Sequence, residues 1–203
     1  MEKWRRTAVV TGGMLLAVVL AGLCITGRIT RKVVSESGVA YGQKVDSVAF
    51  GYRLEQDFVP QYGCLDAVRV HVDASGCARD LGALQVSITD GQGEQVFLEA
   101  VPVSGLPQYG WVEVPVHVRL TPGEASTLVL ESVGCVDNGP GISFLDARLA
   151  AAVEQQGFHL VYAGMDVEHS ALQAAFVYAV PIEIYEYFIY YVFGLLLISL
   201  VVL

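Results

Sequence analysis

The sequence is poor in basic residues, and this shortage excludes one large class of partner. Lysine and arginine together number 12, against 21 aspartate and glutamate residues, so the net charge at neutral pH is −9. The middle of the chain is more unbalanced: residues 33–186 hold six basic and twenty acidic residues. Because a surface of this charge repels phosphate groups, we expect no nucleic-acid partner.

The sequence also lacks the short motifs that mark common catalytic and cofactor sites. It has no glycine-rich phosphate loop, no His-Glu-x-x-His, no Cys-x-x-Cys and no Gly-x-Ser-x-Gly. Asp73 and the segment Asp137–Gly139 carry oxygen atoms of the kind that calcium prefers, but the same residue types are typical of turns. The pattern predicts no cofactor and no metal site, assigns no catalytic residue, and leaves open whether the protein is an enzyme.

Cysteine is scarce, and the four residues are Cys24, Cys64, Cys77 and Cys135. Three of them follow the apolar N-terminal run, and an odd number excludes a complete disulfide framework. Cys64 and Cys77 flank the strand expected at 65–72, roughly 20 Å or more apart, which is too far for a disulfide. If the strand expected at 126–132 runs antiparallel beside 65–72, Cys64 and Cys135 meet at one end. This pair is the candidate disulfide, and three reduced thiols are the alternative.

Two runs contain no charged residue, 7–27 and 187–203. As helices they reach about 31 Å and about 25 Å, and a bilayer core is about 30 Å thick. The runs predict two transmembrane helices, at 7–27 and at 185–203. The first is an uncleaved signal anchor or, alternatively, a signal peptide cut after Ala21. No basic residue follows the second, so we expect it to be truncated and the chain to continue past Leu203.

The charges beside the first run predict an orientation. Lys3, Arg5 and Arg6 precede it, which is typical of a cytoplasmic N-terminus, here residues 1–6. Arg28, Arg31 and Lys32 follow it and partly cancel this bias, and the acidic, lysine-poor middle of the chain, which resembles a translocated segment, decides the orientation. We therefore expect the protein in the cell membrane, with residues 33–181 extracytoplasmic and the lipid bilayer as a partner. Gly13, Ala17 and Ala21 share one helix face at four-residue spacing, which favours contact with other membrane helices. The alternative is that small residues are simply common in such helices.

Between these runs, apolar residues alternate with polar ones. The alternation recurs over 65–72, 84–88, 96–100, 112–118, 126–132 and 172–180. Period-two patterns rich in valine predict half-buried strands, and Asp90–Gly93 and Thr121–Gly123 are typical turn sequences. Residues 143–157 fit a helix or a strand equally well. The sequence therefore predicts a mainly β fold, an antiparallel, jelly-roll-like β-sandwich over 33–181, flanked by two transmembrane α-helices.

Three aromatic residues stand beside glycine-containing loops. They are Tyr62, Tyr109 and Trp111, and exposed rings at such positions can stack on the faces of sugars. The alternative for Trp111 is a core position at the start of a strand. We take the three residues as candidate ligand-binding residues.

The order of features along 45–181 has a counterpart in known modules. The features are Leu54–Phe58, the strand Leu65–Val72, the Val86–Val96 hairpin with Asp90-Gly91, the Trp111 strand, Pro122-Gly123 before Thr127–Leu130, and Tyr162-Ala163-Gly164 before the last strand. This order resembles a jelly-roll module of envelope membrane proteins from Gram-positive, Clostridia-like bacteria. Such modules are similar to galactose-binding or other carbohydrate-binding sandwiches and often precede multi-span regions. The resemblance carries over no site residue.

Three functional hypotheses follow. The first is a membrane-tethered extracytoplasmic binding or interaction module of the cell envelope, with cell-surface glycan as the partner. The second is the ligand-sensing domain of a transmembrane receptor. The third is an accessory domain of a membrane enzyme that assembles glycans. Fold alone does not separate them, because sandwiches host many functions.

Overall fold

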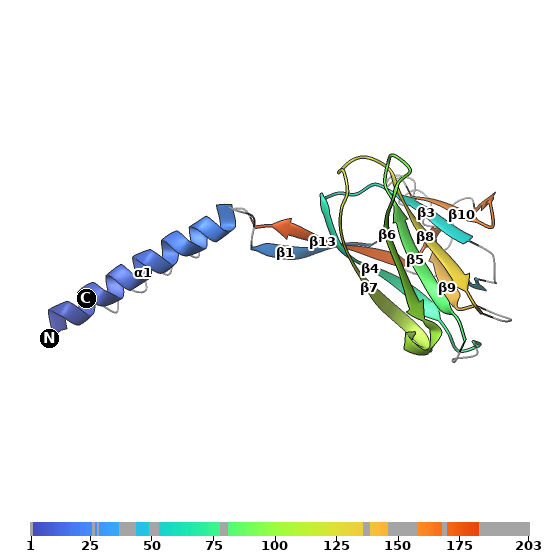
Figure 1. Cartoon of the computed structure of the whole chain (residues 1–203), viewed down its shortest axis with the longest axis horizontal. Helices are drawn as coiled ribbons and strands as arrows, with labels where there is room; N and C mark the ends of the chain where they lie inside the picture. Colours follow the sequence, from blue (N-terminus) through green and yellow to red (C-terminus); the bar gives the residue numbers. More distant parts are fainter. Residues whose placement is uncertain are drawn as a thin grey trace. The chain divides into compact units, whose positions relative to one another are not determined.

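The computed structural model describes residues 2–25, 27, 29–36, 44–48, 53–77, 81–135, 139–145, 158–167 and 170–182. The chain divides into two compact units, one made of residues 1–32 and 180–203 and the other of Val33–Ala179. The elements are, in chain order (Figure 1), α1 (Glu2–Ile25), β1 (Thr30–Glu36), β2 (Lys44–Ser47), β3 (Arg53–Phe58), β4 (Cys64–Asp73), β5 (Ala83–Thr89), β6 (Gln95–Pro102), the short 3₁₀ helix η1 (Val103–Gly105), β7 (Tyr109–Arg119), β8 (Ser126–Val133), β9 (Gly141–Leu145), β10 (His159–Tyr162), β11 (Met165–Asp166), β12 (Ala171–Leu172) and β13 (Ala174–Pro181).

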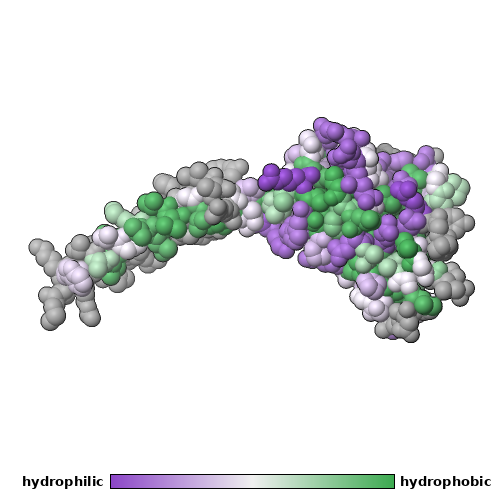
Figure 2. All heavy atoms as spheres, in the orientation of Figure 1, coloured by the Kyte–Doolittle hydropathy of each residue, from purple (hydrophilic) through white to green (hydrophobic). Residues whose placement is uncertain are grey.

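The prediction of two flanking transmembrane helices is wrong for the part of the chain that the structure describes. α1 is its one α-helix, and no helix there is long and apolar enough to cross a membrane. Several large apolar side chains are exposed along α1 (Figure 2), which is the feature that the hydropathy of the run 7–27 reflects.

Three further predictions depend on these transmembrane helices: the localisation, the lipid partner and the helix contacts of the small residues. The prediction of a cell-membrane localisation is wrong for the described part of the chain, because no helix there could cross a membrane. The lipid bilayer as a partner stays a prediction. The second predicted span, 185–203, lies outside the described residues. Gly13 and Ala17 both lie on α1, and Ala17 is buried within its unit. A role for these small residues in helix contacts stays a prediction.

Residues 33–179 form two antiparallel sheets. In the first sheet the order is β1-β13-β4-β9-β12, with β7 paired to β4 and β2 paired to β9. In the second the order is β11-β10-β3-β8-β5-β6. We call them the β4 sheet and the β8 sheet. They face each other, because the Phe58 ring of β3 stacks on the Phe176 ring of β13 with centroids 4.1 Å apart.

Alternating burial explains why these segments are strands. On β5, Leu84, Val86 and Ile88 are fully buried, and on β8 Leu128 and Leu130 are. Successive side chains of a strand point to opposite faces, so each strand contributes its alternate residues to the core between the sheets. The predicted turn at Asp90–Gly93 is confirmed: it joins β5 to β6, and the Asp90 carboxylate accepts hydrogen bonds from the backbone N–H groups of Gln92 and Glu94, both at 2.9 Å.

One polar side chain of this core connects the two sheets. Gln56 of β3 is fully buried, and its Oε1 accepts a hydrogen bond of 2.9 Å from the backbone N–H of Leu172 on β12. Its Nε2 donates to the backbone carbonyl of Asp57 at 2.8 Å. Gln56 therefore joins the two sheets by hydrogen bonding as well as by packing.

The candidate disulfide between Cys64 and Cys135 is not formed. Cys64, Cys77 and Cys135 are free thiols. The pairing required the strand at 126–132 to lie beside 65–72, but β8 lies between β3 and β5 in the opposite sheet. Alternation shows that a segment is a strand but not which sheet it joins. Burial, together with the neighbouring Cys135 and Asp73, raises the pKa of the Cys77 thiol.

Candidate ligand-binding surface

The outer face of the β4 sheet carries a row of exposed side chains from β7. Its members alternate with buried or half-buried residues and are Tyr109, Trp111, Glu113, Pro115, His117 and Arg119. β7 pairs with β4 along its whole length, so that Tyr109 lies opposite Asp73, Trp111 opposite His71, and Glu113 opposite Arg69. Residues that face each other in this way share one face of the sheet. The pairing therefore places the two aromatic rings beside the outward side chains of β4.

At one end of this row, three rings form a cluster that we call the aromatic platform: His71, Tyr109 and Trp111. The His71 ring centroid lies 4.7 Å from that of Tyr109 and 5.5 Å from that of Trp111, and both contacts are edge-to-face, at 77° and 89°. Tyr109 is 58% exposed and Trp111 46%, whereas His71 is only 6% exposed. The two exposed rings are thus supported by a buried third ring.

His71 is held in place by hydrogen bonds. Its Nδ1 lies 2.8 Å from the Ser143 hydroxyl on β9, and its backbone N–H donates to the Gln173 carbonyl at 3.0 Å. Burial lowers the pKa of His71 from its ordinary value of 6.5, and the nearby Asp73 carboxylate partly opposes this shift. The imidazole is therefore neutral at pH 7, and the base of the platform is an uncharged ring.

Asp73 supplies the negative charge beside the platform. Its Oδ1 accepts a hydrogen bond of 2.6 Å from the Ser75 hydroxyl and one of 3.0 Å from the Ser75 backbone N–H. These bonds lower the pKa of the Asp73 carboxyl, so it is ionised at neutral pH. This is the geometry of a turn residue rather than of a metal ligand. In the described part of the chain, no three His, Cys, Asp or Glu side chains come together as metal ligands; Asp137 and Asn138 lie outside it.

Beyond the platform, an ion pair and a histidine–carboxylate contact continue along the same strands, and we call these two pairs the polar row. Arg69 Nε lies 2.6 Å from Glu113 Oε2, and the two side chains are 41% and 42% exposed. His117 Nδ1 lies 2.9 Å from Asp66 Oδ1. Exposed groups of this kind both donate and accept hydrogen bonds at the edge of an aromatic surface.

His117 adopts an unusual backbone conformation. Its φ of 52° is in the left-handed region, which L-residues avoid at a cost of about 1–2 kcal/mol. The β4–β7 register shifts at this point, because Leu65 pairs with Val118 but Ala67 pairs with Pro115. The extra β7 residue forms a β-bulge, and bulges commonly redirect a side chain. Here the bulge brings the imidazole to Asp66.

The three predicted ligand-binding residues do not lie together. Tyr109 and Trp111 are neighbours on the platform. Tyr62 is half-buried beyond the opposite end of β4, where its ring lies 5.6 Å from that of Tyr178. Sequence reasoning missed His71 as a member of the site, because only the pairing of β4 with β7 places it under the two rings.

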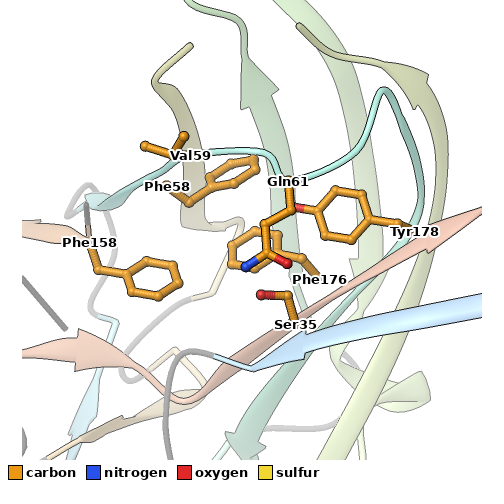
Figure 3. Close-up of a pocket in the computed structure, with 7 residues that line it drawn as sticks. All are labelled: Ser35, Phe58, Val59, Gln61, Phe158, Phe176 and Tyr178. Carbon is orange, nitrogen blue, oxygen red and sulfur yellow. The ribbon is translucent and has the colours of Figure 1, made fainter. Parts of the chain in front are cut away.

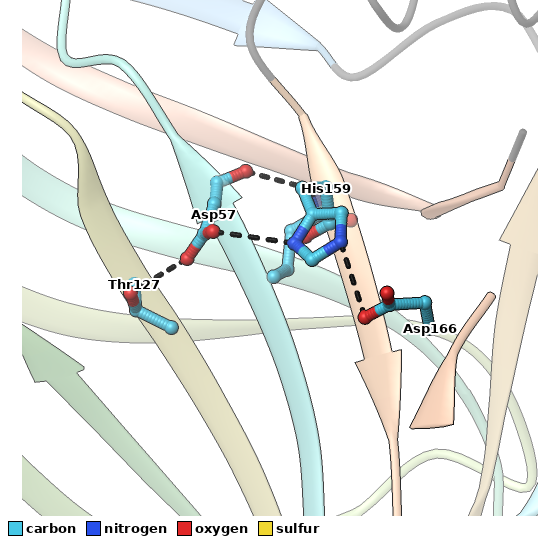
Figure 4. A network of polar contacts seen from close by, with 5 residues as sticks. Asp57, Thr127, His159 and Asp166 are labelled. Carbon is cyan, nitrogen blue, oxygen red and sulfur yellow. Dashed lines mark hydrogen bonds and ion pairs between the residues drawn. The ribbon is translucent and has the colours of Figure 1, made fainter. Parts of the chain in front are cut away.

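The outer face of the β8 sheet carries a different polar cluster (Figure 4). The ring of His159 lies between two carboxylates, with Nδ1 at 3.4 Å from Asp57 Oδ2 and Nε2 at 3.3 Å from Asp166 Oδ1. Thr127 Oγ1 donates to Asp57 Oδ1 at 2.7 Å. The three ionisable side chains are all substantially exposed. This cluster links β3, β8, β10 and β11 across the surface.

Comparisons with known proteins add little. No family model matches the chain, and no curated protein matches it. One solved structure to which the chain is similar is described as a cysteine-to-alanine variant of the clostridial cysteine protease Cwp84 after propeptide cleavage, with 9% sequence identity and a TM-score of 0.45. The match covers 73% of this chain and 40% of that one. A likeness at this level carries no argument about function.

Proposed function

We propose that the unit formed by residues 33–179 is a glycan-binding module and that its binding surface is the aromatic platform. The observation that carries the proposal is the pair of exposed rings, Tyr109 and Trp111, held on a buried, hydrogen-bonded His71. A sugar stacked on these rings buries its apolar C–H face, which favours binding in proportion to the area removed from water. Rings that are already held in position lose little conformational entropy on binding.

The polar row supplies the second half of the interaction. Sugar hydroxyls need partners when they leave water, and Arg69 and Glu113 can provide charge-assisted hydrogen bonds, which are the stronger kind. Trp111 and Glu113 are two residues apart on one strand, which is about 7 Å and close to the size of one sugar ring. A sugar on Trp111 therefore reaches the Arg69–Glu113 pair with its hydroxyls.

The negative charge of the unit limits the kinds of glycan that we expect to bind. Residues 33–186 carry six basic and twenty acidic residues, so the field around the unit repels anions. The Arg69–Glu113 pair is balanced in charge at the site. We expect neutral or amino sugars rather than sugars with carboxylate, sulfate or phosphate groups.

The test is a glycan array probed with the full 203-residue chain, followed by calorimetric titration of the best sugar. Trp111→Ala should weaken binding by roughly 30-fold, equivalent to about 2 kcal/mol, and Tyr109→Ala by about 10-fold. Leu98→Ala removes an exposed apolar side chain on β6 and should leave affinity unchanged. Tyr62→Ala should also have little effect, because Tyr62 lies beyond the opposite end of β4.

Two results would overturn the proposal. One is an array on which the folded wild-type chain binds no sugar. The other is a sugar whose affinity is the same for wild type, Trp111→Ala and Tyr109→Ala, because the sugar would then bind elsewhere on the protein.

A further inference from the structure

A cavity of about 230 Å³ lies between the two sheets at the other end of β4 (Figure 3). Its lining residues come from β1, from β3 and the loop that follows it, from the residue just before β10, and from β13: Ser35, Phe58, Val59, Gln61, Phe158, Phe176 and Tyr178. Tyr178 pairs with Leu65 at the beginning of β4, whereas the platform lies opposite its end, at His71 and Asp73. The cavity, which we call the ring cavity, is therefore separate from the platform.

Stacked phenyl rings form its walls. Phe58 and Phe176 stack at a centroid distance of 4.1 Å and an angle of 19°, and Phe158 lies 6.2 Å from Phe176 at 15°. All three rings are at least nine-tenths buried. The facing surfaces of Phe58 and Phe176 are occupied by each other, so an aromatic ring in the cavity would lie beside this stack and pack against phenyl groups, a favourable contact for an aromatic ligand.

The lining carries no charge. Tyr178 is the one residue of the lining that ionises in an accessible range, and burial raises its pKa to about 12, so it stays neutral at physiological pH. A charged ligand would lose its water here without gaining a partner of opposite charge, which is strongly unfavourable. The ring cavity therefore selects against ions.

Two of the lining residues, Ser35 and Gln61, have polar side chains without an aromatic ring. The Ser35 hydroxyl and the Gln61 carboxamide lie toward each other across the cavity in Figure 3. The remaining walls are aromatic or aliphatic. A sugar would leave most of its hydroxyls without hydrogen bonds against these walls. An aromatic ring with one polar substituent would place that substituent at Ser35 and Gln61, so that the polar groups of the ligand and of the protein are both hydrogen-bonded.

The volume of the ring cavity agrees with a ligand that consists of one aromatic ring. An apolar cavity of about 150 Å³ holds a benzene molecule, and pockets for drug-sized ligands begin at about 300 Å³. The ring cavity lies between these values. We propose that it binds a small neutral molecule made of a single aromatic ring with one hydrogen-bonding substituent, of the size of phenol, with the ring against the phenylalanines and the substituent at Ser35 and Gln61.

The experiment titrates the full chain with phenol and, separately, with toluene, which has the same shape but cannot form a strong hydrogen bond. We expect saturable phenol binding with a dissociation constant in the millimolar range or tighter, roughly tenfold tighter than toluene. Gln61→Ala, at an exposed position, should weaken phenol binding about fivefold and leave toluene unchanged. Ser35→Phe places a ring in the cavity and should abolish binding of both probes.

Controls keep each outcome interpretable. Far-ultraviolet circular dichroism establishes that each variant is folded, and Val59→Trp serves as the filling variant if Ser35→Phe does not fold. Leu98→Ala and Trp111→Ala should bind phenol like wild type, so that a failure of the platform proposal leaves this test intact. The proposal is overturned by absence of saturable phenol binding up to about 10 mM, by phenol binding that persists in a folded filling variant, or by displacement of phenol by glucose or galactose.

Discussion

The aromatic platform and the ring cavity are built from similar side chains at opposite ends of β4, but their rings differ greatly in exposure to water. Tyr109 and Trp111 are 58% and 46% exposed, whereas Phe58 and Phe176 are each 1% exposed. The platform rings lie on the outer face of one sheet. The cavity rings come from both sheets and hold them together.

Because of this difference in exposure, we expect the platform rings to serve mainly ligand binding and the cavity rings mainly the stability of the fold. An exposed ring contributes little to folding, because it is nearly as exposed in the unfolded chain, and its apolar surface remains available to a ligand. A buried ring contributes several kcal/mol to folding, and only the space left beside it can serve a ligand. The same residue type therefore has different roles at the two ends of one strand.

The largest expected effect concerns the cavity. Phe176→Ala should lower the free energy of unfolding by about 3–5 kcal/mol, because it removes a buried ring that stacks on Phe58 across the sheets. Trp111→Ala should lower it by less than about 1 kcal/mol, since it changes an exposed position. Urea unfolding followed by circular dichroism measures both. Equal losses in the two variants would show that the platform is part of the core and would remove the contrast.

Alkaline pH should lower the stability of the fold through Tyr178, at the cavity end of β4. The pKa of Tyr178 is about 12 in the folded protein, against an ordinary value of 10.0. Between these values the unfolded chain releases the phenolic proton while the folded protein retains it, so stability is complete below pH 10 and falls as the pH rises toward 12. The total loss is about 2–3 kcal/mol. Urea midpoints at pH 9, 10 and 11 should fall more steeply for wild type than for Tyr178→Phe; identical slopes would contradict this prediction.

Acidic pH should lower the stability of the fold through His71, at the platform end of β4. The pKa of His71 in the folded protein lies below 6.5, so below pH 6.5 the unfolded chain takes up a proton that the folded protein resists. Stability is therefore present above pH 6.5 and decreases as the pH falls, by at most about 1.4 kcal/mol per pH unit. His71→Gln should remove this part of the dependence. Sugar affinity should fall over the same range and phenol affinity should not, and a parallel fall in both would show that the two sites are coupled.

The smallest effect concerns the polar row. Glu113→Gln breaks an ion pair whose side chains are about two-fifths exposed, so the free energy of unfolding should change by less than about 1 kcal/mol. Sugar affinity should fall about threefold, because one charge-assisted hydrogen bond becomes neutral. Glu99→Gln on β6 is the matched exposed control. A sugar affinity that is unchanged in Glu113→Gln would restrict the binding surface to the rings.

Some of this architecture could be predicted from local sequence. Alternation over 84–88 and 126–132 predicted β5 and β8, and Asp90–Gly93 predicted the turn that joins β5 to β6. Tyr109 and Trp111 were identified as candidate ligand residues because they flank a glycine near the start of a valine-rich strand. Each of these inferences needs only neighbouring residues, since strand alternation and turn preferences are local properties.

Other predictions failed because they depended on distant residues or on hydropathy alone. The Cys64–Cys135 pairing assumed that two strands were neighbours, and the structure places them in opposite sheets. The uncharged run at 7–27 predicted a transmembrane helix, but no helix in the described part of the chain is long and apolar enough to cross a membrane. Tyr62 was grouped with Tyr109 by the similar loops that contain them, although the β4–β7 register holds them far apart.

By itself, the sequence determined the strands that have clear apolar alternation, the turn between β5 and β6, and the negative charge, because these follow from the order of side chains along the backbone. Only the tertiary structure decided which strands are neighbours, and with them both candidate sites. His71 supports Tyr109 and Trp111 because β4 pairs with β7, and Phe58 meets Phe176 because the two sheets pack face to face. Such contacts join residues far apart in the chain, and their geometry arises when the sheets bury their apolar faces against each other.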